Sequence, residues 1–318
     1  MRSSLFTVAG ALALTNAGSI VDTAYGKLEG TASDYRPNIE VFKGVPFSQP
    51  PVGSLRWKAP EKPASWSGVK QAFTFGAECP QTLSSPSDET NDSSPLSSIA
   101  NVTSEDCLYL NVWRPANATK GDKIPVYLWY YGGRFTSGSG AVLAYDGSGL
   151  AFKGVMVVTM NYRTGPFGFY AHPDLAAENA HNSSGNYAVL DMQAALHWVH
   201  EEIENFGGDP ECITTGGQSS GSSCSLDMIY SPLSRDLIAG TIAESGARAP
   251  RDGLTGSLAT SYRNKTEAYA NGVATMAYFN VTTIAEMRNL SMDTLLDVLN
   301  ENSDIFDGTQ YENVTNCT

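Results

Sequence analysis

The residues best suited to chemistry form the pentapeptide Gly217-Gln218-Ser219-Ser220-Gly221. This G-x-S-x-G pattern is typical of a sharp turn from strand to helix, in which glycines let the two elements approach closely and the serine hydroxyl is exposed. Ser219 is therefore predicted to be a nucleophile. Because a helix that follows points its N-terminus at the reacting centre, the backbone N–H of Ser220 is expected to donate to developing negative charge.

The bare pattern is weak evidence, since glycine and serine are common, and the flanking elements must support it. A β-rich run starts at Cys212 and a helix-compatible segment ends at Ile229, so both neighbours of the turn are present. Residues 237–243 favour a further strand. The alternation of strand and helix predicts an α/β fold with a doubly wound parallel sheet, in which ligands bind at the carboxyl ends of the strands.

Upstream elements fit the same architecture. The apolar runs 126–131 and 155–160 are typical of strands buried on both faces. Apolar residues at helical spacing predict a helix over 186–206 that stops at the glycine pair which follows. These residues are Val189, Met192, Leu196, Val199, Ile203 and Phe206.

The N-terminal part has a different pattern. Residues 20–42 predict two or three short antiparallel strands, and 104–113 predict another strand. Between them, prolines and aromatic residues exclude a helix and indicate an extended loop that Trp57 and Trp66 pin to the core.

Composition bounds the class of protein. The 318 residues are 42% hydrophobic, enough for a substantial core in one large domain or two smaller ones. The net charge of −13 and the lack of a basic run argue against binding to nucleic acid or to an anionic membrane. No cofactor and no metal are expected.

The first residues indicate export. Residues 1–17 combine Arg2, a short apolar stretch and small residues, as in a secretory signal peptide, with cleavage expected after Ala17. The stretch falls short of the ~20 apolar residues that a bilayer span needs, and no other segment could span. Glycosylation sequons support a secreted protein. They are at Asn91, Asn101, Asn117, Asn182, Asn264, Asn280, Asn289, Asn313 and Asn316.

Five cysteines in an oxidising compartment predict disulfides and one leftover thiol. Cys79 and Cys107 flank a polar loop and are the favoured pair. Cys212 and Cys224 lie on opposite sides of the turn, so a bridge between them is open to doubt on distance alone. Cys317 is expected to be unpaired.

Five segments together resemble the type-B carboxylesterase family of α/β-hydrolases, which includes cholinesterases, related fungal lipases and non-catalytic adhesion proteins. The segments are FKGVPFSQPPVGSLRW, SEDCLYLNVW, NYRTGPFGF, GNYAVLDMQAALHWVHEEIENFGGDP and GGQSSG. The resemblance implies an α/β-hydrolase fold with a mostly parallel central sheet and an antiparallel N-terminal part. It also implies that residues 18–318 are the N-terminal portion of the family's domain, and that the sheet is incomplete on its C-terminal side.

Carried over by position, the resemblance makes Ser219 the acylated nucleophile and Gly133, Arg134 and Ser220 the backbone donors of the oxyanion hole. The family usually has glycine where Arg134 stands. The main-chain N–H survives that change, but a long cation beside the acyl site would reshape the pocket. The resemblance also implies a Cys79–Cys107 disulfide. Two structural ion pairs are expected, Arg56 with Glu105 and Arg163 with Asp191.

The family's acid and histidine follow the nucleophile, yet no histidine follows Ser219 in this sequence. The four histidines, His172, His181, His197 and His200, precede it and are expected to be surface or packing residues. Glu244 matches a framework position of the family, not its acid. Residues 251–318 are expected to form a helical insertion on the lid side, with 283–300 as one amphipathic helix.

These observations leave alternative functions open. The chain could be a fragment of a secreted serine esterase that hydrolyses small-molecule carboxylic esters through an acyl-serine, and would then be nearly inert alone. It could instead be a non-catalytic, cholinesterase-like binding or adhesion protein, although the intact turn around Ser219 argues against that. A second chain could supply the histidine, but a sheet cut at an internal strand would expose an apolar edge. The acyl and alcohol preferences and the oligomeric state are open.

Overall fold

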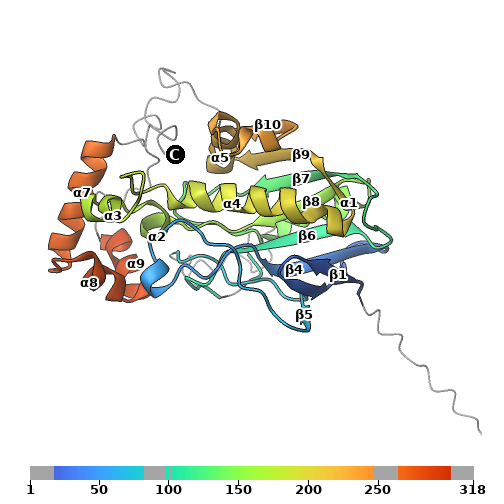
Figure 1. Ribbon diagram of the computed structural model, residues 1–318, viewed down its shortest axis with the longest axis horizontal. Helices are drawn as coiled ribbons and strands as arrows, with labels where there is room; N and C mark the ends of the chain where they lie inside the picture. The colour runs from blue at the N-terminus through green and yellow to red at the C-terminus, as the bar shows by residue number, and fades with distance from the viewer. Residues whose placement is uncertain (1–17, 82–97, 101, 247–263, 302–318) are drawn as a thin grey trace, which may run out of the picture.

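The computed structural model of the chain describes residues 18–81, 98–100, 102–246 and 264–301. Its centre is a seven-stranded sheet in the order β10-β9-β7-β8-β6-β4-β3 (Figure 1). The strands are β3 (Thr31–Ala32), β4 (Ile39–Pro46), β6 (Tyr109–Pro115), β7 (Ile124–Tyr130), β8 (Met156–Met160), β9 (Gly208–Gln218) and β10 (Gly240–Glu244). β10, β9, β7 and β8 are parallel, whereas β6, β4 and β3 run antiparallel. The mixed α/β sheet predicted from the sequence is confirmed.

A smaller sheet precedes the main one. It has the order β1-β2-β5, with β1 (Ile20–Thr23), β2 (Gly26–Glu29) and β5 (Val69–Gln71). The first two form the expected antiparallel hairpin. The loop between β4 and β5 is held as predicted: Trp57 donates its indole N–H to the Pro166 carbonyl (2.8 Å) and Trp66 to the Lys27 carbonyl (3.0 Å).

Helices and turns connect the strands. The α-helices are α1 (Ser148–Ala151), α2 (Gly165–Phe169), α3 (Pro173–Ala177), α4 (Tyr187–Glu202), α5 (Ser220–Tyr230), α7 (Lys265–Tyr278), α8 (Ile284–Asn289) and α9 (Met292–Glu301). The 3₁₀ turns are η1 (Gly53–Leu55), η2 (Leu143–Tyr145), η3 (Ile203–Phe206) and η4 (Arg235–Leu237). The long helix predicted over 186–206 is α4 followed by η3, and Gly207 ends it with φ 94°. The strand expected at 237–243 begins later, at Gly240, because Leu237 belongs to η4.

The face of the sheet that α4 covers holds the main hydrophobic core. Val126, Leu128 and Tyr130 of β7 are buried there with apolar residues of α4 such as Met192 and Leu196. Successive side chains of a strand point to opposite faces. Figure 1 shows α4 lying lengthwise along the sheet, so the predicted stripe on this helix is the part that packs against the strands.

The other face is covered unevenly, and one prediction was wrong there. β8 is buried along its whole length as expected, because Val157 packs with Ala151 of α1. β7 is not: Tyr127 and Trp129 on its outer face are only half-buried. Among the described residues, no helix covers the outer face of β7, β9 and β10 at that point. The apolar sequence of β7 therefore predicted the strand correctly, but not that both of its faces would be buried.

The helices after residue 264 gather beside α2 and α3 at one end of the molecule (Figure 1). They bury a second hydrophobic cluster that includes Trp57, Phe167 and Met287. The expected single helix over 283–300 was wrong, because the chain forms α8 and α9 instead. Leu290 between them is extended, with ψ 142°, and its carbonyl oxygen accepts a hydrogen bond from the Arg56 guanidinium (2.7 Å).

Three buried ion pairs brace the fold. The two that the resemblance implied are present: the Arg56 guanidinium pairs with Glu105, and Arg163 pairs with Asp191 at 2.7 Å. A third was not expected from the sequence. It joins Arg114 of β6 to Glu40 of β4 at 2.9 Å, with both side chains nearly inaccessible to solvent. None of the described helices is both long and apolar enough to cross a membrane.

Candidate active site

Ser219 lies at the carboxyl end of β9, immediately before the first residue of α5. Its backbone has φ 58° and ψ −123°, a conformation that costs a non-glycine residue roughly 1–3 kcal/mol. Main-chain hydrogen bonds hold it: the Ser219 N–H donates to the Glu244 carbonyl (2.9 Å), and the Ser219 carbonyl accepts from the N–H groups of Ser222 (3.0 Å) and Ser223 (3.4 Å). The strained turn predicted from the sequence is therefore present, with the serine partly exposed.

The flanking glycines are required by close backbone approaches. A Cβ on Gly217 would lie 2.2 Å from the Gly221 carbonyl oxygen, and a Cβ on Gly221 would lie 2.1 Å from the Tyr130 carbonyl oxygen. Real side chains essentially never come so close. The pentapeptide can thus connect β9 to α5 only with glycine at both ends, because α5 runs back directly over the end of β7.

The loop that follows β7 lies against this turn. A Cβ on Gly132 would be 3.1 Å from the Ser219 Cβ and 2.6 Å from the Gln218 carbonyl oxygen. After it, Gly133, Arg134 and Phe135 have φ values of 126°, 58° and 64°. Three consecutive residues with positive φ therefore turn the chain sharply just after the glycine that contacts the serine.

The main-chain N–H groups of the three predicted donors are unpaired as far as the described residues go. Within the described ranges, no acceptor takes the N–H of Gly133, Arg134 or Ser220. The first amides of a helix have no partner inside it, so the N–H of Ser220 is available. Gly132, which precedes two of the predicted donors, lies against Ser219, and Ser220 follows it directly. The Arg134 side chain is exposed, and the ion pairs among the described residues do not include it.

A pair of tyrosines anchors the loop. The rings of Tyr131 and Tyr162 stack with centroids 4.2 Å apart, and each phenol donates to the other's main-chain carbonyl, at 2.9 Å from Tyr131 and 2.7 Å from Tyr162. Burial raises the pKa of both phenols well above the usual value, so both remain protonated donors. Tyr131 immediately precedes Gly132, and the pair therefore fixes where the donor loop starts. The sequence offered no motif for this contact.

A second anchor holds the far end of the loop. The Gln81 amide donates to the Gly138 carbonyl (2.9 Å) and accepts from the Gly138 N–H (2.8 Å). Two residues away, Cys79 forms a disulfide with Cys107, with Cα atoms 5.0 Å apart. Cys212 and Cys224 are free thiols, whereas Cys317 lies outside the described residues. The disulfide thus sits beside the segment that positions the loop.

None of the four histidines hydrogen-bonds Ser219, although all lie within the described ranges. His172 is buried and caps α3, and burial lowers its pKa. His181 is exposed. The other side-chain contacts are of His172 with the Asp174 N–H (3.1 Å), of His197 with the Leu233 carbonyl (2.9 Å) and of His200 with the Glu211 carboxylate (3.9 Å). A base for Ser219 is therefore not provided by these side chains.

Residues 17–316 match the family model described as "Carboxylesterase family". The chain belongs to the carboxylesterase family. With this family the chain shares the α/β-hydrolase fold: a solved PNB esterase superposes with a TM-score of 0.74 at 34% identity, over 89% of this chain and 53% of that one.

Curated relatives of this carboxylesterase-family chain include enzymes from bacteria and a mammal. It is 44% identical over 251 residues to the fumonisin B1 esterase of Sphingopyxis macrogoltabida, covering 79% of this chain and 42% of the relative. It is 42% identical over 233 residues to the para-nitrobenzyl esterase of Bacillus subtilis (72% and 44%), and 36% identical over 282 residues to liver carboxylesterase 1 of Oryctolagus cuniculus (86% and 46%). The chain thus spans less than half the length of these relatives.

The predicted glycosylation sites fall into two groups. Five of the asparagines lie in the described ranges, and each is exposed: Asn117, Asn182, Asn264, Asn280 and Asn289. The other four lie outside the described residues, at Asn91, Asn101, Asn313 and Asn316. The predicted signal peptide at 1–17 also lies outside them, as do residues 251–263 and 302–318 of the predicted lid-side insertion.

Proposed function

We propose that the chain carries the nucleophile and the oxyanion donors of a secreted serine hydrolase that acts on small-molecule carboxylic esters. The observation that carries this proposal is a strained, partly exposed Ser219 next to Ser220 and against the loop of Gly133 and Arg134, whose N–H groups have no acceptor among the described residues. A protein that only binds has no need of three free donors beside a serine held in a costly conformation. Membership in the carboxylesterase family supports the ester as substrate.

The chemistry follows from these groups. The Ser219 Oγ attacks the ester carbonyl carbon, its proton passes to a base, and the carbonyl oxygen becomes an oxyanion held by the free N–H groups. The tetrahedral species then expels the alcohol, which receives that proton, and leaves an acyl-serine for water to hydrolyse. Each oxyanion donor is typically worth about 10²–10³ in rate. The Arg134 amide donates like a glycine amide in this role.

The base and its acid are assigned to polypeptide equivalent to the part of the relatives that has no counterpart in this chain. This chain spans 42–46% of the relatives named above, and its own histidines contact other groups. The chain alone is then expected to retain only the contribution of oxyanion hole and binding, about 10³–10⁴ over water.

Secretion is part of the proposal. The features of residues 1–17, the exposed sequon asparagines and the Cys79–Cys107 disulfide all suit an exported glycoprotein. Expression in a eukaryotic secretory host, with digestion by an endoglycosidase and mass measurement, would test it. A chain found only in the cytosol and without glycans would contradict it.

The hydrolase proposal is tested by labelling the purified chain with a fluorophosphonate and measuring turnover of p-nitrophenyl acetate. The expected result is slow labelling at Ser219, mapped by mass spectrometry, with turnover far below that of a full-length relative. Ser219→Ala should abolish labelling. Arg134→Gly, which keeps the main-chain N–H, should change the labelling rate by less than about threefold if the donor is the amide.

Two other outcomes would change the assignment. Absence of both labelling and turnover would favour the non-catalytic binding protein. Fast turnover that Ser219→Ala removes would show that the chain needs no further base.

A further inference from the structure

Arg134 carries a positive charge on the loop that lies against the nucleophile. Its backbone has φ 58°, in the left-handed region where glycine avoids the clash that a Cβ meets. Its side chain is exposed, and no ion pair or cation–π contact among the described residues includes its guanidinium. By contrast, Arg56, Arg114 and Arg163 each pair with a carboxylate. A long cation thus occupies a position that suits glycine, and no ion pair of the described fold uses its charge.

Contacts on both sides fix the main chain at Arg134. Before it, a Cβ on Gly132 would be 3.1 Å from the Ser219 Cβ. After it, Phe135 is buried and its carbonyl accepts the Gly165 N–H (2.8 Å). Two residues span at most about 7 Å of chain, so the Arg134 Cα stays within that distance of Gly132. Its guanidinium, at the end of a flexible stem of methylenes, can therefore reach the space around Ser219.

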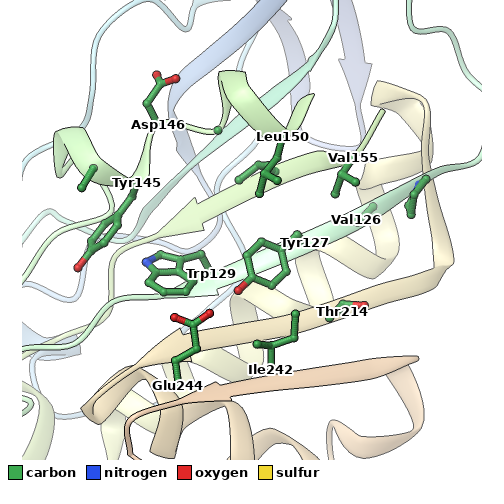
Figure 2. Close-up of a pocket in the computed structure, with 14 residues that line it drawn as sticks. Val126, Tyr127, Trp129, Tyr145, Asp146, Leu150, Val155, Thr214, Ile242 and Glu244 are labelled. Atoms are coloured by element: carbon green, nitrogen blue, oxygen red, sulfur yellow. The ribbon is translucent and has the colours of Figure 1, made fainter. Parts of the chain in front are cut away.

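The turn at Ser219 offers this cation no carboxylate partner. Its pentapeptide, residues 217–221, is uncharged. Glu244 accepts the Ser219 N–H through its main-chain carbonyl, but its carboxylate lies elsewhere. Figure 2 shows that carboxylate near Trp129, in a groove of about 550 Å³ on the outer face of the sheet that Ile242 also lines and Arg134 does not. The guanidinium of Arg134 is therefore available to a ligand of Ser219 as far as the described residues go.

The charge of the whole protein makes a local cation more consequential. With 33 acidic and 20 basic residues, the net charge of −13 repels anionic ligands at long range. Salt screens that repulsion beyond about 8–10 Å at physiological ionic strength, whereas a guanidinium in contact with the ligand is screened much less. Whether an anionic ester is favoured over a neutral one then depends on the cations that touch it.

We propose, on the basis of the hydrolase function above, that Arg134 is a specificity residue that favours esters with a carboxylate a few bonds from the scissile carbonyl. The main-chain N–H of Arg134 donates to the oxyanion at about 3 Å, so the bound ester lies beside the residue that bears the charge. The planar guanidinium binds a carboxylate through two parallel N–H donors. The carboxylate can belong to the acyl or to the alcohol part, which the experiment separates.

The test labels Ser219 with pairs of fluorophosphonates that differ in charge. In each pair one probe ends in a carboxylate and the other in the methyl ester of that carboxylate. The first pair has this group on the alkyl chain at phosphorus, which stands for the acyl part, and the second has it on the alkoxy chain, which stands for the alcohol. The measured quantity is the labelling rate of the carboxylate probe divided by that of its methyl ester. For one pair this ratio should fall about fivefold in Arg134→Gln, the upper range for an exposed ion pair.

Three further measurements serve as controls. Arg134→Gly should lower the ratio as Arg134→Gln does, and glycine adopts φ 58° without strain, so a distorted loop would not explain the loss. Added salt should lower the ratio of the native chain. Arg36→Gln is the matched charge control, because Arg36 is exposed, has no ion pair among the described residues, and lies between β3 and β4 at the other edge of the sheet. It should change the ratio by less than about 1.5-fold.

The outcomes separate this inference from the hydrolase proposal. If the methyl ester probes label Ser219 but both ratios are the same in the native chain and in the two Arg134 variants, the specificity role is wrong and the nucleophile stands. Equal losses in Arg36→Gln and Arg134→Gln would also overturn the role, since net charge would then be the cause. If no probe labels Ser219, the hydrolase proposal fails, and the specificity role fails with it.

Discussion

The two faces of the central sheet differ along a single strand. On β7, Leu128 and Tyr130 are fully buried under α4, whereas Tyr127 and Trp129 on the reverse side line an open groove. The covered face carries the core that holds the Ser219 turn, because α5 packs on the same side. The comparison teaches that the helix after the nucleophile packs on the closed face, while the reverse face of the same strand stays partly exposed to solvent.

The largest difference in lost stability between the two faces is expected when a carboxylate is removed from each. Asp191→Ala would leave the Arg163 guanidinium buried and unpaired beneath α4, and should lower the free energy of unfolding by about 3–5 kcal/mol. Glu244→Ala in the groove should cost less than about 0.5 kcal/mol, because that carboxylate is exposed. Urea unfolding followed by circular dichroism measures both. If both variants lost the same free energy of unfolding, the two faces would not differ in how much their charged side chains stabilise the fold.

Truncation of apolar side chains should give a smaller difference. Leu128→Ala on the covered face should cost about 2–5 kcal/mol, because it leaves a cavity in a closed core. Ile242→Ala on the open face should cost under about 1 kcal/mol, since half of that side chain already meets solvent. The same urea unfolding experiment on the two variants measures both changes.

The smallest effect concerns two tyrosines of β7. Burial, and secondarily the charge of Glu244, raises the pKa of Tyr127 to about 12, while burial raises the pKa of Tyr130 well beyond the usual value. Because the folded state favours the neutral phenol, the raised pKa of Tyr127 adds to the free energy of unfolding. This contribution is fully present below the unfolded pKa near 10 and is lost as the pH rises toward 12. Tyr127→Phe should therefore flatten the fall in stability over that range.

Absorbance at 295 nm provides the measurement. Ionisation of Tyr127 should be seen in the folded protein near pH 12, and Glu244→Gln should shift it to lower pH, since a negative neighbour is removed. Tyr130 should ionise only upon unfolding. A folded-state titration that Tyr127→Phe leaves unchanged would assign the signal to another tyrosine.

The parts of the fold that the sequence could predict are those with local requirements. The turn at Ser219 was predictable because Gly217 and Gly221 satisfy backbone approaches that no other residue allows. The helix before it was predictable from its apolar stripe. The break at Leu290 was not, because it is set by Arg56, which lies 234 positions away in the chain. Likewise, no local sequence pattern predicts the Arg114–Glu40 ion pair or the stacking of Tyr131 on Tyr162.

The uncovered side of β7 could not be predicted for a related reason. Valine, leucine, tyrosine and tryptophan in a run indicate a strand, but whether both sides are covered depends on elements far along the polypeptide. Tyrosine and tryptophan also suit half-buried positions, because each has a polar atom on an apolar ring.

Glu244 contacts the Ser219 turn through its main chain and the outer face of the sheet through its side chain. Its carbonyl oxygen holds the amide of Ser219, and its carboxylate stands in the hollow on the reverse of the sheet. A change that displaces β10 at this residue would therefore also displace the main-chain acceptor that holds the Ser219 amide.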